Sequence, residues 1–269
     1  MKRYLLYILV FFTITSCEEL YDLEPAEETP DLIVVDGIIT NEKTRHEIKI
    51  SLPSASINVE NEPVKGAIVF ISNEDTTFLL SESNSKPGVY LTDSIRCYTG
   101  KNYQLSISYK GQSYLAITKM IPVSPFVPLT FAKKNSTENL YYALPYLGSE
   151  EPAMFEITAD WRHIGPMNEN DTIMMARILY YNLKTIDVPE VFAAGQETVF
   201  FPAGTIITEK KYSLNDTHAA FLRSLLLESA WTGGNFDATH ANLLTNLSDG
   251  AIGYFGACNV LVDTIYVTP

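Results

Sequence analysis

Residue types that carry catalytic and metal chemistry are scarce in this sequence. The chain of 269 residues has four histidines and three cysteines, and no histidine has a second one at the His-x-His or His-x-x-x-His spacing of a metal site. A Gly-x-Ser-x-Gly elbow, a phosphate-binding glycine loop and a calcium loop ending in glutamate are also missing. Acidic neighbours such as Glu150 and Glu151 are weak indicators of a glycosidase among 32 acidic residues. We predict no enzymatic activity, no metal and no cofactor.

Positive charge is in short supply as well. Lysine and arginine number 19 against 32 aspartates and glutamates, which gives a formal net charge of -13. Such a chain would approach nucleic acid or anionic lipid headgroups against electrostatic repulsion. We therefore expect no nucleic-acid partner.

Long apolar runs are rare, and the clearest one lies near the amino terminus. Residues 4–12 are apolar and follow Lys2 and Arg3, but the run is well short of the roughly 20 residues that a membrane-spanning helix needs. A basic start, an apolar stretch and small residues before a cut are typical of a secretory signal peptide. We predict a lipoprotein signal peptide over residues 1–16; the alternative is an ordinary signal peptide, or a short membrane anchor, that ends near Cys17 by chance.

The end of this segment, Ile14-Thr15-Ser16-Cys17, resembles the lipobox of bacterial lipoproteins. The resemblance implies that Cys17 becomes the lipidated, palmitate-carrying first residue of the mature protein. Glu18 and Glu19 resemble the surface-export signal of Bacteroidota lipoproteins, and residues 17–30 resemble an acidic tether; a solvated linker without an address is the alternative. We expect a protein that is lipid-anchored in the outer membrane and exposed at the cell surface.

The other two cysteines, Cys97 and Cys258, lie far apart in the sequence. In an oxidising compartment such a pair is a candidate disulfide. Two buried free thiols that pack as small apolar residues are the alternative, and the sequence leaves both open.

Aromatic residues and short alternating segments are plentiful. Aromatic residues make up 12% of the chain, far more than a disordered acidic protein would carry. About seven short strands separated by glycine, proline and asparagine predict a mainly β protein with an Ig-like β-sandwich over residues 31–121. Three prolines within residues 122–128 predict an extended linker and a domain boundary.

Residues 129–269 predict a second β-rich domain with one main α-helix at about residues 216–230. Asn215 or Asp216 can cap this helix by accepting from its free amides. Phe221, Leu222, Leu225 and Leu226 fall on one helical face. We expect this face to pack on the sheet, with partner binding as the alternative.

Two groups of motifs carry a family resemblance. The order Pro63-Val64-Lys65-Gly66, then Pro87-Gly88-Val89-Tyr90, then residues 98–107 resembles transthyretin-like or carboxypeptidase-regulatory-like sandwiches. The run of residues 242–257 is similar to the closing motif of a Bacteroidota outer-membrane lipoprotein family, domain of unknown function 4249. The resemblance covers nearly the whole mature chain and implies a role beside TonB-dependent outer-membrane receptors.

A binding surface is a better expectation than an active site. Five aromatic residues are candidates for a ligand platform, because their rings combine contact area with a polar group: Tyr141, Tyr142, Tyr146, Trp161 and Trp231. Core packing of these rings is the alternative. The sequence favours a non-catalytic accessory or ligand-capturing partner of a TonB-dependent nutrient-uptake system, with a structural surface spacer or adhesin as the alternative and the small ligand unknown.

Overall fold

The computed structural model describes residues 32–54, 59–125, 127, 129–144, 151–167, 172–183, 198–229 and 243–268. All of them belong to the compact unit Leu32–Pro269, which is distinct from the unit Met1–Asp31. The predicted signal peptide and tether, with Cys17, Glu18 and Glu19, lie outside the described residues.

The described chain is mainly β, as the sequence predicts, with one helix. The strands before the predicted linker are β1 (Ile33–Thr40), β2 (Thr44–Ser51), β3 (Ile68–Ser72), β4 (Thr77–Leu79), β5 (Ser81–Glu82), β6 (Val89–Ile95), β7 (Asn102–Tyr109) and β8 (Gln112–Lys119). The later elements are β9 (Thr130–Lys133), β10 (Leu140–Leu144), β11 (Ala153–Asp160), β12 (Met175–Asn182), β13 (Phe201–Pro202), β14 (Ile206–Ser213), α3 (Asp216–Ser229), β15 (Ala251–Cys258) and β16 (Val260–Tyr266).

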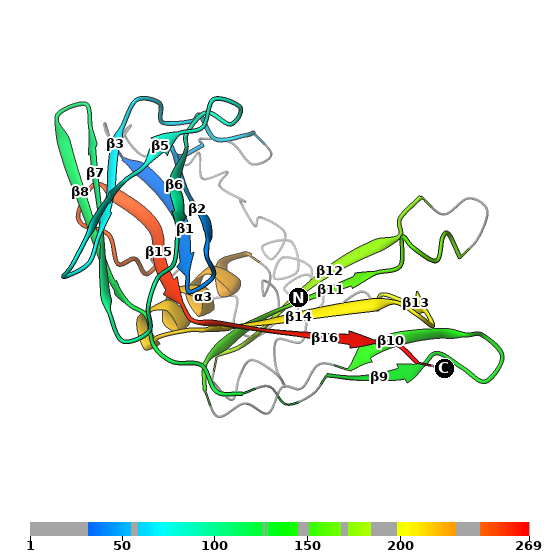
Figure 1. Ribbon diagram of the computed structural model, residues 1–269. Coiled ribbons are helices and arrows are strands. Elements are labelled where there is room, and N and C mark those ends of the chain that lie inside the picture. The colour runs from blue at the N-terminus through cyan, green and yellow to red at the C-terminus, as the bar shows by residue number, and fades with distance from the viewer. Residues whose placement is uncertain are drawn as a thin grey trace, which may run out of the picture. The chain divides into compact units, whose positions relative to one another are not determined.

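Two sheets form a sandwich around a shared apolar core (Figure 1). One sheet has the strand order β15-β1-β2-β6-β5 and the other β4-β3-β7-β8. Alternation along β2 and β8 buries every second side chain, so that each strand has one apolar face toward the core and one polar or exposed face. Ile48, Ile50, Leu105 and Ile107 are among the fully buried core residues.

The strand β15, late in the sequence, lies beside β1, the first strand of the described chain. It pairs in parallel with β1 over its whole length, from Ile33↔Ala251 to Thr40↔Cys258. The sequence grouped these residues with the region 129–269, whereas the structure makes β15 a strand of the amino-terminal sheet. β1 thus has two neighbours, β15 and β2, and lies inside the sheet.

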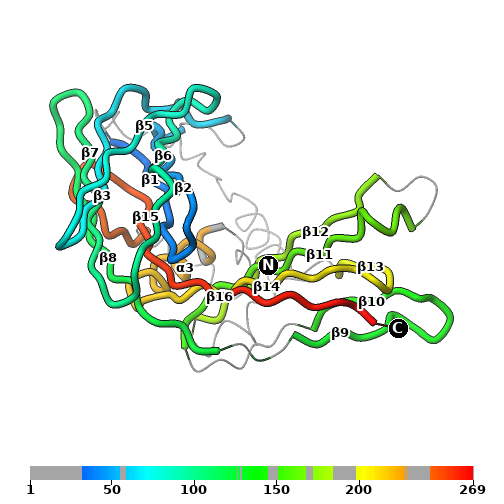
Figure 2. The backbone as a smooth tube through the Cα atoms, viewed as in Figure 1, coloured from blue at the N-terminus to red at the C-terminus, as the bar shows by residue number. Residues whose placement is uncertain are grey.

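A second four-stranded sheet, β12-β11-β14-β16, continues the chain from β15 through the single residue Asn259 (Figure 2). The small sheet β13-β10-β9 packs on it, because Tyr141 and Phe201 share one apolar cluster with Phe155, Ile157 and Trp161.

The helix α3 is capped by Asn215, one of the two residues that the sequence offered. The Asn215 side-chain oxygen accepts from the His218 amide at 2.9 Å. Phe221 and Leu222 are buried against Tyr254 and Cys258 of β15, so the predicted apolar face packs on the sheet. Leu225 differs, since it is 37% exposed.

Strand β14 buries two charged residues on one face. Glu209 is 2% exposed and Lys211 is 3% exposed. Glu209 Oε1 accepts from the Tyr180 hydroxyl at 3.0 Å, while its Oε2 is buried without a hydrogen-bond partner in the part of the chain that the structure describes. Burial raises the pKa of Glu209, and the nearby charge of Asp263, its register partner on β16, raises it further.

We expect Glu209→Gln to stabilise the protein relative to wild type increasingly as pH rises. Because the pKa is raised in the folded state, the contribution of Glu209 to stability is largest below its unfolded pKa and is lost as pH rises through the folded pKa. The loss is at most about 1.4 kcal/mol per pH unit. The introduced amide oxygen can still accept from Tyr180. Urea unfolding of both proteins at about pH 4.5, 6 and 7.5 measures the difference, and a difference independent of pH would contradict this expectation.

A charged cleft as the candidate functional site

An open cleft of about 1100 Å³ lies on the outer side of the five-stranded sheet. Alternation along β1 and β2 turns Asp36, Glu47 and Lys49 away from the core and into this cleft. The remaining lining comes from neighbouring positions on these strands, from the loop at 60–63, from the segment 85–89 and from β12: Gly37, Ile38, Ile50, Ser51, Glu60, Asn61, Glu62, Pro63, Ser85, Lys86, Pro87, Val89 and Arg177.

The cleft carries charges of both signs. Four carboxylates line it, Asp36, Glu47, Glu60 and Glu62, together with the cations Lys49, Lys86 and Arg177. Within the described chain, Lys86 and Glu47 form a loose ion pair of 3.8 Å, while Asp36, Lys49, Glu60 and Glu62 have no ion-pair partner. Lys49 and Asp36 are register partners on adjacent strands. The unpartnered charges remain available to a ligand that carries both signs.

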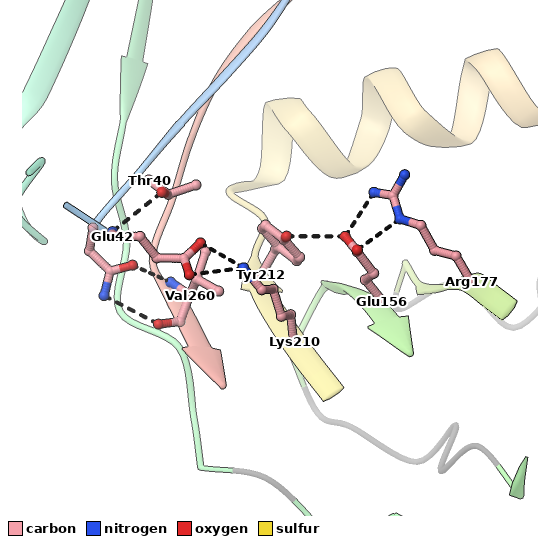
Figure 3. Close-up of polar contacts among 8 residues, drawn as sticks. Thr40, Glu42, Glu156, Arg177, Lys210, Tyr212 and Val260 are labelled. Atoms are coloured by element: carbon pink, nitrogen blue, oxygen red, sulfur yellow. Dashed lines mark hydrogen bonds and ion pairs between the residues drawn. The ribbon is translucent and has the colours of Figure 1, made fainter. Parts of the chain in front are cut away.

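Arg177 lies on β12, in the sheet β12-β11-β14-β16, and lines the cleft from there. Glu156 on the neighbouring strand β11 holds it in place (Figure 3). Its Nε donates to Glu156 Oε1 at 2.7 Å and its Nη2 to Oε2 at 2.8 Å. The Tyr212 hydroxyl donates to the same carboxylate at 3.2 Å. The Arg177 guanidinium, through these hydrogen bonds, holds the pKa of Glu156 below its usual range. The pair therefore fixes a cation, 61% exposed at its side chain, in the cleft wall.

A second set of polar contacts joins the β1–β2 turn to β14 and β16 beside this wall. Lys210 Nζ donates to both oxygens of Glu42, at 2.9 and 3.1 Å (Figure 3). The Asn41 side chain accepts from the Val260 amide at 2.7 Å and donates to the Val260 carbonyl at 3.2 Å. These contacts lie where β15 passes into β16, so they fix the strand that carries the sandwich into the next sheet.

The closing motif of the sequence, residues 242–257, connects three strands. It includes most of β15, which pairs with β1, and it hydrogen-bonds to β8. Asn246 accepts from the Phe255 amide and donates to the carbonyls of Phe255 and Ile117. The Thr245 hydroxyl donates to the Gly253 carbonyl at 2.8 Å. A Cβ added at Gly256 would lie 2.7 Å from His218 Cε1, so glycine is needed there for the ring to pack against the strand. The motif therefore serves packing and strand pairing.

His218, Tyr254 and Cys258 form a buried cluster between α3 and β15. The His218 ring stacks on Tyr254 at 4.5 Å, and its Nδ1 lies 3.8 Å from Cys258 Sγ. Burial lowers the pKa of His218 to about 4 and raises the pKa of Cys258 to about 12. Both groups are uncharged at neutral pH, and a neutral buried thiol is a poor nucleophile. The cluster is core packing.

Cys97 and Cys258 are both free and buried. Cys97 packs in the core between the two sandwich sheets, whereas Cys258 packs with α3 on the opposite face of β15. The two thiols are therefore on opposite sides of the five-stranded sheet, and the alternative of two buried thiols is the one that the structure contains.

The predicted aromatic platform is divided by the fold. Tyr141 and Trp161 are 5% and 2% exposed and belong to the core between the two later sheets, which corrects their assignment to a ligand surface. Tyr142 is half-buried and packs edge-on against Phe200 at 6.0 Å. Tyr146 and Trp231 lie outside the described residues.

The sequence interpretation did not identify the residues that line the cleft. The alternation around Ile48 was a usable signal, because it places Glu47 and Lys49 on one outward face. Arg177 had no comparable signal, since it comes from a strand of a different sheet. Among the described residues, no group of three or more histidine, cysteine, aspartate or glutamate side chains is placed to hold a metal ion. None of the described helices is long and apolar enough to cross a membrane.

Comparison with known protein families identifies the family of this chain. Residues 18–264 match the family described as Domain of unknown function (DUF4249). No curated protein matches the chain.

Proposed function

The chain belongs to the DUF4249 family, and from this premise we propose that it is a non-catalytic, lipid-anchored outer-membrane protein that captures a small polar ligand for a TonB-dependent nutrient-uptake system. The charged cleft is the binding site in this proposal. The lipid on Cys17 would hold the protein at the membrane, and Glu18 and Glu19 would direct it to the cell surface.

The observation that carries the ligand-binding part is the cleft with its fixed guanidinium. Its volume of about 1100 Å³ is slightly above the roughly 300–1,000 Å³ of typical small-molecule sites, so it has room for a small ligand. Arg177 is oriented by Glu156, so that a carboxylate on the ligand would meet a preorganised donor. Asp36, Glu60 and Glu62, which have no ion-pair partner among the described residues, offer acceptors for a ligand ammonium. A short peptide carries both groups and fits this charge pattern.

The membrane part rests on the sequence. Ile14-Thr15-Ser16-Cys17 after a short apolar stretch supports lipidation, and the acidic residues behind it support export. An acidic chain of net charge -13 would be repelled by anionic headgroups, which favours a covalent lipid over electrostatic attachment.

One observation favours the alternative of a surface spacer or adhesin. The passage from β15 to β16 is stiffened by the contacts of Asn41 with Val260 and of Glu42 with Lys210. A stiff connection between two sheets suits a protein that holds one part at a distance from another. The spacer predicts that the cleft binds no small molecule.

We expect Lys49→Ala to weaken peptide binding about tenfold, because it removes one charge-assisted contact worth roughly 1.5 kcal/mol. Native mass spectrometry with a mixture of tri- to pentapeptides, and separately with neutral oligosaccharides, measures binding. The matched control is Lys65→Ala, which removes an exposed lysine outside the cleft. Peptide binding that neither Lys49→Ala nor Arg177→Met changes would exclude the cleft as its site, and absence of any binding would favour the spacer.

The partnership has its own test. The protein extracted from membranes in mild detergent should recover a TonB-dependent receptor in a quantitative pull-down, and a variant with Cys17 replaced by Ser should recover less because it is not held in the same membrane. Recovery of no outer-membrane receptor or channel would contradict the uptake role and leave ligand binding unaffected.

A further inference from the structure

The five-stranded sheet carries a second cavity beside the charged cleft. This cavity has a volume of about 380 Å³ and is lined by Arg45 on β2, by residues 81–85 and by residues 91–93 on β6. We call it the hairpin pocket, because residues 81–85 belong to the hairpin between β5 and β6. Ser85 in this hairpin lines both the cleft and the hairpin pocket. The two cavities are therefore neighbours.

Strand register joins the hairpin pocket to the cleft. Glu47 of the cleft lies opposite Leu91 of the pocket, and Leu91 lies opposite Ser81 on the edge strand β5. In the adjacent row, Asp36 lies opposite Lys49, and both residues line the cleft. Directly opposite side chains of an antiparallel pair lie on the same face of the sheet. The cleft and the pocket are therefore parts of one surface that runs across β1, β2, β6 and β5.

A β-bulge shapes the hairpin pocket. The register of β2 on β6 shifts between Arg45 and Glu47, so that His46 alone lies opposite both Thr92 and Asp93. The His46 amide donates to Thr92 Oγ1 at 2.9 Å. Bulges redirect side chains and are common beside functional sites. Here Thr92 is buried, whereas Asp93 after it is exposed and lines the pocket.

The hairpin pocket offers a hydrogen-bond donor and an acceptor to a ligand. Arg45 and Asp93 form no ion pair within the described chain. Glu82 is already engaged, since its carboxylate accepts from the amides of Gly66 at 2.8 Å and Gly88 at 3.1 Å. A peptide backbone presents both a carbonyl oxygen and an N–H at each residue. The Arg45 guanidinium can donate to the first, and the Asp93 carboxylate can accept from the second.

The lining of the two cavities favours a peptide over an oligosaccharide. A sugar ring has an apolar face that packs well on an aromatic side chain, and none of the described residues that line the cleft or the hairpin pocket is aromatic. We infer that the cleft and the hairpin pocket form one groove that binds an extended peptide. This ligand class rests on the proposed binding role of the cleft, to which the hairpin pocket adds a second subsite.

The width of the groove sets the length of the peptide. Asp36 on β1 and Ser81 on β5 are separated by the strands β2 and β6, which makes the distance across the strands roughly 14 Å. An extended chain advances about 3.4 Å per residue, so that about four residues cross this distance. A peptide of about six to eight residues therefore fills the cleft and the hairpin pocket together, whereas a tripeptide fills only one of them.

Calorimetric titration of the full chain carrying Cys17→Ser compares two peptides: a tripeptide that binds the cleft, and an octapeptide in which Ser-Gln-Ser-Gln-Ser precedes the same three residues. The octapeptide should bind about tenfold more tightly, because it gains contacts in the hairpin pocket. Ser81→Trp, which fills the pocket, and Arg45→Ala, which removes its donor, should each lower this ratio of affinities to below about two. The control Ser113→Trp adds the same bulk at an exposed residue of β8, in the other sandwich sheet, and should leave the ratio at about ten.

The ratio of affinities separates the extended groove from the proposed function. Lys49→Ala should weaken both peptides and leave their ratio unchanged, because Lys49 lines the cleft and not the hairpin pocket. A wild-type ratio near one with cleft binding intact, or a ratio that neither Ser81→Trp nor Arg45→Ala lowers, would overturn the extended groove and leave the proposed function standing. Tighter binding of an octasaccharide than of a trisaccharide that Ser81→Trp abolishes would overturn the peptide class. No binding of either peptide would overturn both the groove and peptide capture by the cleft.

Discussion

Replacing Gly253 by alanine should destabilise the protein by at least about 4 kcal/mol and prevent folding if the wild type is only moderately stable. Gly253 has φ +99°, and an added Cβ would overlap the Val35 carbonyl oxygen of the neighbouring strand. That atom is backbone in the parallel β1–β15 ladder, and Val35 is the register partner of Gly253. Relief would therefore need the two strands to separate. Urea unfolding followed by far-UV circular dichroism measures the effect.

The matched control for this substitution is Gly66→Ala. Gly66 has φ +70°, and an added Cβ there would have no neighbour within 4 Å. Gly66→Ala should lower the free energy of unfolding only by the strain of a left-handed backbone, about 1–2 kcal/mol. The difference between the two variants isolates the close approach of β15 to β1. Equal losses of stability would mean that strand contact at Gly253 is unimportant.

Replacing Cys17 by serine should move nearly all of the protein from the membrane fraction to the soluble fraction and abolish incorporation of a palmitate label. The reason is chemical, because a hydroxyl cannot receive the thioether-linked lipid that the lipobox resemblance implies. Membrane attachment by acyl chains scales at about 0.8 kcal/mol per buried methylene group, so losing the chains removes the whole attachment. Fractionation with metabolic labelling measures both effects, and Cys97→Ala is the control that keeps Cys17. Persistence of labelled protein in the membrane would exclude Cys17 as the anchor.

The acidic pair behind Cys17 is separable from the anchor. Replacing Glu18 and Glu19 together by alanine should keep the lipid and the membrane fraction but remove accessibility to protease added to whole cells. Replacing Glu27 and Glu28 by alanine makes the same charge change farther from Cys17 and should leave accessibility unchanged. The comparison distinguishes an export address from a tether that merely needs acidic charge.

The parallel pairing of β15 with β1 also bears on how this protein folds. Without β15, β1 would become an exposed sheet edge, and an exposed edge is a site of unwanted pairing. The amino-terminal sheet is therefore completed by residues more than 200 positions later, with Ile33 opposite Ala251. Such non-local pairing closes a long loop and slows folding.

The sequence by itself determined the local features of this protein. Alternation around Ile48 and Ile50 identified a strand with one buried face, because strand side chains alternate with period two. The capping candidates Asn215 and Asp216, before the apolar positions Phe221 and Leu222, identified the start and the buried side of the helix α3. The scarcity of histidine and cysteine and the acidic balance are also properties of composition alone.

Only the tertiary structure decided which distant segments meet. Period two shows which side of a strand is buried, but it does not show which strand lies beside it, because the same alternation fits many partners. The β1–β15 pairing, the approach of Arg177 to the cleft and the placement of Cys97 and Cys258 on opposite faces of one sheet all depend on such pairings. Tyr141 and Trp161 likewise became core residues because a second sheet covers them.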